Sequence, residues 1–154
     1  MEQRLEYKEL APDGFKAMMG FEHYIHSTGL EAGLLELVKT RVSQINHCAW
    51  CLDMHTKDAL ARGESQQRLL LLPAWREANC YTERERAAFA WAEAVTLLAT
   101  EEVSDEIYEE ARRHFTDKEL VGLTFAIIAI NGWNRLNVPF RTPVGDYKPG
   151  IYTK

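Results

Sequence analysis

Proline is unevenly distributed along this chain. The five prolines stand at positions 12, 73, 139, 143 and 149, which leaves two long spans without proline. Proline has no amide hydrogen and interrupts helix interiors and central strands, so spans without it can form long regular elements. Neither span shows the sustained alternation of apolar and polar residues that marks a half-buried strand. The sequence therefore predicts an all-α fold of about six or seven helices.

Capping motifs mark where several of these helices begin. A threonine followed three residues later by glutamate can satisfy the free amide groups of a helix N-terminus. This motif occurs as Thr28 with Glu31, Thr82 with Glu85, and Thr116 with Glu119. The predicted helices cover approximately residues 12–27, 30–45, 48–63, 65–72, 83–99, 104–115 and 116–137, so the third carries a C-x-x-C motif at its N-terminus.

The length of 154 residues predicts one domain, 1–154, with a hydrophobic core of its own. We expect the helical core to cover about residues 12–138. Residues 139–154 contain three prolines and two glycines, so we expect an extended C-terminal tail that carries no chemistry.

The run 120–130 is apolar nearly all round, which indicates a buried helix. The run is about half the ~20 residues that a bilayer requires, so no membrane span is predicted.

Charge and the N-terminal sequence restrict the partners and the location. The net charge is -5 at pH 7, and the basic residues form no block that would bind nucleic acid or an anionic membrane. Residues 1–10 are charged and lack the apolar run of a signal peptide, so we expect a cytoplasmic protein. Thiols are kept reduced there, which makes a C-x-x-C motif more often catalytic or metal-binding than a structural disulfide.

The stretch from Ile45 to His55 holds the C-x-x-C motif, formed by Cys48 and Cys51, and His55 follows the second cysteine by four residues. On a helix that begins near Cys48, these three side chains share one face. A neighbouring imidazole and the positive end of a helix both favour the reactive thiolate. We interpret the stretch as a redox site.

Glu36 is a candidate partner for His55. A helical hairpin that turns near Asn46 would bring the two side chains level, and a carboxylate could then orient the imidazole and accept its proton. Periodicity indicates the opposite, because a helical wheel places Glu36 about 160° from the centre of the apolar stripe of its helix. On that pattern alone, Glu36 is a solvated surface residue.

Glu36, eleven further residues, Cys48-x-x-Cys51, three more residues and His55 together resemble the signature of the AhpD-like alkylhydroperoxidases of the carboxymuconolactone decarboxylase superfamily. The Ile-Asn-x-Cys approach and the Ala-Leu-Ala-Arg-Gly segment are also similar, so the resemblance covers about residues 31–63. It implies an all-α fold, homo-oligomers such as trimers or hexamers, and reduction of hydroperoxides by the cysteine pair. A dithiol or thioredoxin-like partner would return the electrons. The chemistry requires no metal and no cofactor.

Carried over to this sequence, the resemblance implies that Cys51 attacks the peroxide, Cys48 resolves the intermediate, and Glu36 and His55 relay protons. General C-x-x-C chemistry instead favours Cys48 as the more acidic thiol, because it lies nearest the helix N-terminus. Trp50 departs from the pattern, since family members can have a second histidine there. His47 could replace that histidine from the other side, and Trp50 could cover the thiols or simply pack.

Three other functions compete with a peroxidase. Decarboxylation or lactone chemistry does not depend on a cysteine pair, and we see no cluster of basic residues to hold a dicarboxylate. A general disulfide oxidoreductase would use the same two thiols. A structural zinc site needs four ligands, and the second pair is missing from the sequence.

Other candidate residues receive structural interpretations. We expect Cys80 to be a small buried apolar residue, and His23, His26 and His114 to be surface or capping residues. Asn131, Asn134 and Arg135 end the last helix and could line the site or an interface, but we favour helix-end capping.

Overall fold

The computed structural model describes residues 2–152. The fold is all-α, as predicted, and no strand occurs within the described residues. Eight α-helices and one short 3-10 helix, η1, lie between residues 2 and 152. Their bounds are α1 Tyr7–Leu10, α2 Pro12–His26, α3 Ala32–Ile45, α4 Ala49–Ala61, α5 Gln66–Leu71, η1 Leu72–Ala74, α6 Glu83–Thr96, α7 Asp105–His114 and α8 Asp117–Phe140.

Helix α1 was not predicted. It forms where the Glu6 side chain accepts a hydrogen bond from the Lys8 amide, and it buries Tyr7 against the body of the protein. The phenol of Tyr7 donates a hydrogen bond to Asn137, which is 130 residues away along the chain. Because of this extra element, the cysteine pair lies at the start of the fourth α-helix, α4, and not of the third.

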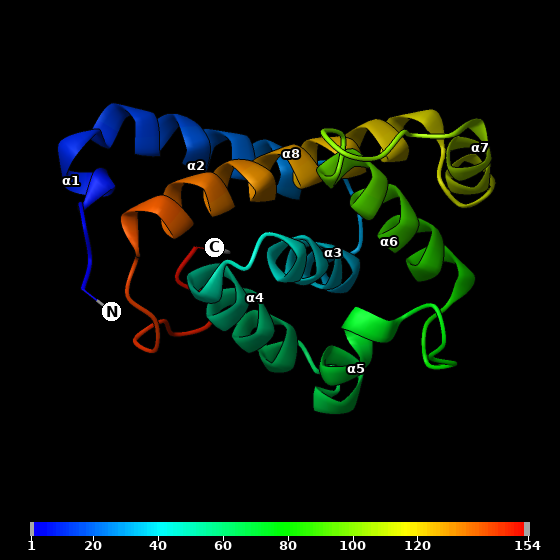
Figure 1. Ribbon diagram of the computed structural model, residues 1–154, viewed down its shortest axis with the longest axis horizontal. Helices are drawn as coiled ribbons and strands as arrows, with labels where there is room; N and C mark the ends of the chain where they lie inside the picture. The colour runs from blue at the N-terminus through cyan, green and yellow to red at the C-terminus, as the bar shows by residue number, and fades with distance from the viewer. Residues whose placement is uncertain (1, 153–154) are drawn as a thin grey trace.

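Helix α3 occupies the middle of the fold (Figure 1). It packs against α4, α6 and α8, while α2 lies along α8. Leu37 and Val38 of α3 and Leu123, Ile127 and Ile130 of α8 are almost completely buried and form the centre of the core. A helix in this position is covered on nearly its whole circumference, so even its polar residues can be buried.

Two of the three predicted capping boxes form, at Thr82 and Thr116. The one predicted at Thr28 does not. The Thr28 hydroxyl donates to the carbonyl of Ile25 at the end of α2, and α3 begins at Ala32 after an N-cap residue, Glu31, that makes no side-chain cap. Glu31 instead accepts two hydrogen bonds from the Arg84 guanidinium, at 3.0 and 3.1 Å. A contact between distant helices has therefore replaced a local one.

Two further segments differ from the prediction. Helix α6 ends at Thr96, so Leu98, which was placed on its apolar face, lies in the following turn and is 63% exposed. Pro139 belongs to the last turn of α8, and the irregular tail begins after it. The tail lies along α4, where Asp58 accepts hydrogen bonds from the Tyr147 phenol at 2.7 Å and the Gly150 amide at 3.0 Å.

Within the described part of the chain, no helix combines the length and the apolar character needed to cross a membrane.

Candidate active site

The turn between α3 and α4 positions the two cysteines. His47 adopts a left-handed conformation there, with φ of 55°, and Cys48 becomes the N-cap residue of α4. The Cys48 sulfur accepts a hydrogen bond from the Cys51 amide at 3.4 Å. The Cα atoms of the pair are 5.4 Å apart, and the two sulfur atoms lie at disulfide-bonding distance. The first turn of α4 thus holds the pair in a geometry that permits reversible disulfide formation.

Glu36 and His55 form a buried pair. The Glu36 carboxylate lies 2.8 Å from Nδ1 of His55, and the two residues are only 3% and 4% exposed. The periodicity argument that made Glu36 a surface residue is therefore wrong, because α4 covers the side of α3 that the apolar stripe leaves open. Burial raises the pKa of Glu36, but the hydrogen bond and charge of His55, with Lys39 and Arg62, outweigh burial and hold the pKa below its ordinary value.

A cavity of about 40 Å³ opens beside these groups. Cys51 and His55 both line it, whereas Cys48 does not. Both cysteines are buried, and the cavity gives a small molecule a place to meet Cys51. Aromatic and thioether side chains make up much of the cavity wall, together with several charged groups. Besides Cys51 and His55, the lining residues are Tyr7, Lys8, Phe15, Met19, Glu22, His26, Glu36, Lys39, Trp50, Met54, Trp133 and Tyr152.

A second buried ion pair lies in the cavity wall, between two residues that were not among the predicted site residues. Nζ of Lys39 lies 2.6 Å from the Glu22 carboxylate, which also accepts a hydrogen bond from the Trp133 indole at 2.9 Å. Lys39 follows Glu36 by three residues and so shares its helix face, which is the signal that could have revealed it. His26 is exposed, as expected of a surface residue, but it also lines the cavity. Partial loss of water around the ring at the cavity lowers the pKa of His26.

Residues from α1 and from the tail, Lys8 and Tyr152, form the roof of the cavity. Nζ of Lys8 lies 5.3 Å from the ring centre of Trp50 and 5.8 Å from that of Tyr152. Tyr152 stacks on Tyr147, whose phenol is bonded to α4. The tail was expected to carry no chemistry, but it supplies one wall of the site. Trp50 is one of the residues that line the cavity.

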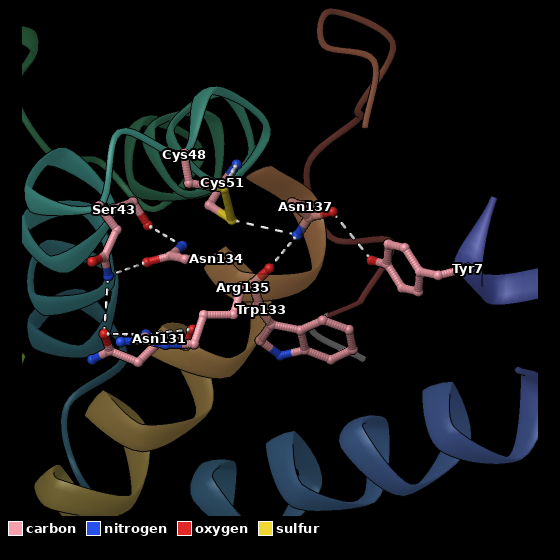
Figure 2. Close-up of a disulfide and its surroundings, with 10 residues drawn as sticks. Tyr7, Ser43, Cys48, Cys51, Asn131, Trp133, Asn134, Arg135 and Asn137 are labelled. Atoms are coloured by element: carbon pink, nitrogen blue, oxygen red, sulfur yellow. Dashed lines mark hydrogen bonds between the residues drawn. A yellow bond between two sulfur atoms is a disulfide. The ribbon is translucent and has the colours of Figure 1, made fainter. Parts of the chain in front are cut away.

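Figure 2 shows a residue that contacts the Cys51 sulfur directly. Nδ2 of Asn137 donates to this sulfur at 3.5 Å. Asn134 and Asn131, expected to be helix-end caps, lie inside α8, where both bind Asn46 in the turn before the cysteines. Asparagines recur on α8 every three residues, at 131, 134 and 137, and this spacing was the available signal.

The remaining candidates lie away from the cavity. His47 is exposed and does not line it, which gives no support to the idea that it replaces the missing histidine. Cys80 is a free thiol and is partly exposed, so the expectation of a buried residue is wrong. Among residues 2–152, no group of three or more His, Cys, Asp and Glu side chains is arranged to hold a metal ion.

The chain is similar to known proteins in both sequence and fold. The sequence model of the carboxymuconolactone decarboxylase family matches residues 12–94, and the chain belongs to this family. The chain is 43% identical over 138 residues to the uncharacterized protein YdfG of Bacillus subtilis strain 168, covering 90% of this chain and 94% of that protein.

Solved structures place the chain among the AhpD-like members of the family. It is 45% identical to a protein of unknown function from Agrobacterium tumefaciens, for which an antioxidant defence role as AhpD has been suggested. The two structures agree with a TM-score of 0.90, and the match covers 94% of this chain and 100% of that one. A peroxidase-related protein from Ralstonia eutropha JMP134 shares the fold at 21% identity and a TM-score of 0.79, over 90% of this chain and 74% of that one.

Proposed function

We propose that this protein is a thiol-dependent peroxidase that reduces hydroperoxides through Cys48 and Cys51, in the cytoplasm, with a dithiol or a thioredoxin-like protein as the reductant. The observation that carries the proposal is the shared cavity: the Cys51 thiol and the Glu36–His55 pair line one small space. A nucleophile, an acid-base group and room for a small substrate are thereby collected at one point.

The first step reduces the peroxide. The Cys51 thiolate attacks the terminal, hydrogen-bearing oxygen of ROOH, the S–O bond forms, and the O–O bond breaks. Two electrons pass from sulfur to the peroxide, Cys51 becomes a sulfenic acid, and the departing RO⁻ takes a proton from His55 to leave as an alcohol. In the second step, the Cys48 thiol gives up its proton and its thiolate attacks the Cys51 sulfur. The S–S bond forms, the S–O bond breaks, and the departing hydroxide takes up that proton and leaves as water.

Glu36 and His55 act together in this scheme. The ionised carboxylate accepts a hydrogen bond from Nδ1–H of His55, which leaves Nε2 as the nitrogen that exchanges protons with the thiol and the leaving oxygen. His55 follows Cys51 by one helical turn, so the two side chains lie on the same face of α4. Glu36 thus serves as the orienting residue and His55 as the acid and base.

The position of Cys51 supports its assignment as the attacking thiol. Both cysteines are buried, but Cys51 lines the cavity and Cys48 is not among the lining residues. Cys48 caps the helix N-terminus, where the free amide groups stabilise a thiolate that can resolve the sulfenic acid.

The reductant completes the cycle by thiol–disulfide exchange. A dithiol attacks the Cys48–Cys51 disulfide, leaves as a disulfide itself, and returns two electrons to the pair. Both sulfur atoms are buried, so a protein reductant requires the roof formed by α1 and the tail to move aside. The same burial favours a small hydroperoxide over a protein disulfide as the first substrate.

The lactone and decarboxylase chemistry of other family members is not supported in the same way. A dicarboxylate substrate calls for two unpaired cations, and of the two lysines that line the cavity, Lys39 is already neutralised by Glu22.

The proposal includes assembly into a homo-oligomer, a trimer or hexamer. Exposed apolar side chains support it: Val121 and Ile128 of α8 and Leu98 of the turn after α6. Sedimentation equilibrium would measure the subunit number, and a monomer at all concentrations would contradict this part of the proposal.

Peroxide consumption with dithiothreitol as reductant tests the proposed reaction. We expect Cys51→Ser and Cys48→Ser each to reduce the steady-state rate at least about a hundredfold, because each removes one partner of the redox cycle. Cys80→Ser is the matched control and should behave as wild type, since this thiol does not line the cavity. Equal slow consumption by wild type and Cys51→Ser would refute the proposal.

A further inference from the structure

The amide of Asn137 is held in one orientation by three partners. Its Nδ2 group donates to the backbone carbonyl of Trp133 at 3.0 Å and to the Cys51 sulfur at 3.5 Å, while its Oδ1 accepts from the Tyr7 phenol at 3.1 Å (Figure 2). A side-chain amide can be turned by 180° at little cost only where its neighbours permit it. Here they do not, because the Trp133 carbonyl can only accept, so the group that faces it must be NH₂.

The second hydrogen of this NH₂ group therefore points to Cys51. Asn137 is 2% exposed, and both NH₂ hydrogens and the amide oxygen have protein partners, so little freedom remains to the side chain. A disulfide sulfur is a weak acceptor, whereas a thiolate is a strong one. The interaction therefore strengthens when the pair is reduced, and it requires no rearrangement at that moment.

We propose that Asn137 is a further catalytic residue of this site, whose amide stabilises the Cys51 thiolate by donating a hydrogen bond to the sulfur. Tyr7 is a positioning residue that holds the amide through its oxygen. The inference deepens the proposed function, because it rests on Cys51 reacting as a thiolate. A hydrogen bond to the charged form of a group favours that form, so Asn137 makes the thiolate available at neutral pH.

Charged groups around the cavity also act on Cys51. His55 and Lys8 favour the thiolate when they carry positive charge, and Glu36 opposes it, while Glu22 and Lys39 neutralise each other. The titratable groups that share the cavity with Cys51 come from α1, α2, α3, α4 and the tail, and they are Tyr7, Lys8, Glu22, His26, Glu36, Lys39, His55 and Tyr152. Asn137 differs from all of them because it has no charge to titrate, so its effect persists at every pH.

Neither residue belongs to the segment that identifies the family. The family match covers residues 12–94, whereas Tyr7 precedes it and Asn137 follows it. The thiolate donor thus comes from α8 and its support from α1, two elements that the C-x-x-C motif does not specify.

Titration of a single thiol tests the inference in the full-length chain. In a Cys48→Ser, Cys80→Ser background only Cys51 titrates, and serine is a favourable N-cap that preserves the start of α4. The ultraviolet absorbance of the thiolate is followed against pH in this parent, in Asn137→Leu and in Tyr7→Phe. Asn134→Leu is the matched control, because Asn134 is an asparagine on the same helix, equally buried, and bound to Ser43 and Asn46.

We expect Asn137→Leu to raise the pKa of the Cys51 thiol by about one unit, which lowers the thiolate fraction about tenfold at a fixed pH below the midpoint. Tyr7→Phe should raise it by less, since the donor remains but is held less firmly. Asn134→Leu should leave the midpoint at the parental value even though it removes buried hydrogen bonds.

A parental midpoint in both Asn137→Leu and Tyr7→Phe would overturn the inference, and so would an equal shift in Asn134→Leu, which would indicate a general packing effect. Should Asn137→Leu fail to fold, Tyr7→Phe decides alone, because it removes a single hydroxyl group. Peroxide plays no part in this titration. A protein whose thiol titrates as expected but which consumes no peroxide would refute the proposed function and leave the role of Asn137 in place.

Discussion

Replacing Lys39 by methionine should destabilise the fold by an amount that depends on pH. The Lys39 and Glu22 side chains are 4% and 12% exposed, with 2.6 Å between Nζ and the carboxylate. Methionine retains most of the aliphatic stem and removes the charge. Removing one partner of such a pair costs about 3–5 kcal/mol when the other charge stays buried and unpaired.

Protonation of Glu22 limits this cost. Burial raises the pKa of Glu22, but the charge and hydrogen bond of Lys39 outweigh burial and hold it below the ordinary value of 4.5. Without Lys39, the carboxyl group can take up a proton in the folded state. Protonating a carboxyl group whose ordinary pKa is 4.5 costs about 3.4 kcal/mol at pH 7, because each pH unit above that pKa is worth about 1.36 kcal/mol. We therefore expect Lys39→Met to lower the free energy of unfolding at pH 7 by about 3 kcal/mol, which corresponds to a decrease of roughly 6–12 °C in Tm for a chain of this size.

The sign of the pH dependence follows from the same proton. In Lys39→Met, the folded protein retains a proton that the unfolded chain releases above pH 4.5, so the penalty grows as pH rises and falls below about 1 kcal/mol at pH 5. Urea unfolding of wild type, Lys39→Met, Glu22→Gln and the double variant measures this directly. The double variant should recover about 2 kcal/mol relative to Lys39→Met, because no carboxylate remains to be buried. A cost below about 1 kcal/mol at pH 7, or a cost that does not change between pH 7 and pH 5, would refute the reasoning.

Three other perturbations have expected outcomes. Tyr147→Phe removes the 2.7 Å hydrogen bond that fastens the tail to α4, so mass-spectrometric hydrogen exchange should accelerate over residues 145–152 while α2 is unchanged; equal exchange in both proteins would contradict the anchoring role. The pKa of Glu36 is held below 4.5, so its contribution to stability is present above that value and is lost as pH falls through the folded pKa. Acid unfolding of Glu36→Gln should accordingly show a shallower decline than wild type, and parallel curves would argue against the assignment. Gly122→Ala would place a Cβ atom 3.2 Å from two carbons of Thr28 and should lower the stability measured in thermal melts by about 1–3 kcal/mol. Gly20→Ala adds a Cβ atom with nothing within 4 Å inside a helix and should raise the stability by about 0.5–1 kcal/mol.

Several features could be predicted from the sequence because they depend on neighbours along the chain. The seven predicted helices correspond to α2–α8, and capping boxes form at Thr82 and Thr116. The C-x-x-C spacing places Cys48 and Cys51 on the first turn of α4, with His55 one turn later. In each case, the interacting residues are separated by seven positions or fewer, a distance at which helical geometry alone determines which side chains meet.

The errors arose where a contact between distant segments competed with a local preference. Thr28 has the sequence of a capping box, but Glu31 binds Arg84, 53 residues away. Glu36 lies opposite the apolar stripe of α3, but the Glu36–His55 pair buries both polar groups where α4 covers that side. Tyr152 belongs to a segment with no helical or catalytic signal, and only the anchoring of the tail to α4 brings it to the cavity.

By itself, the sequence determined the all-α class, the helix positions and the pairing of two thiols with a nearby imidazole, because these depend on proline placement, periodicity and short spacings. Only the tertiary structure decided which thiol faces the cavity and how Glu22 and Lys39 line it. It also decided that Asn137 contacts the Cys51 sulfur and that Tyr7 holds Asn137. The physical reason is that these side chains come from α1, α2, α3, α4 and α8, and their distances are set by how the helices pack. Helical packing reflects the burial of the whole apolar surface, and no short stretch of residues encodes it.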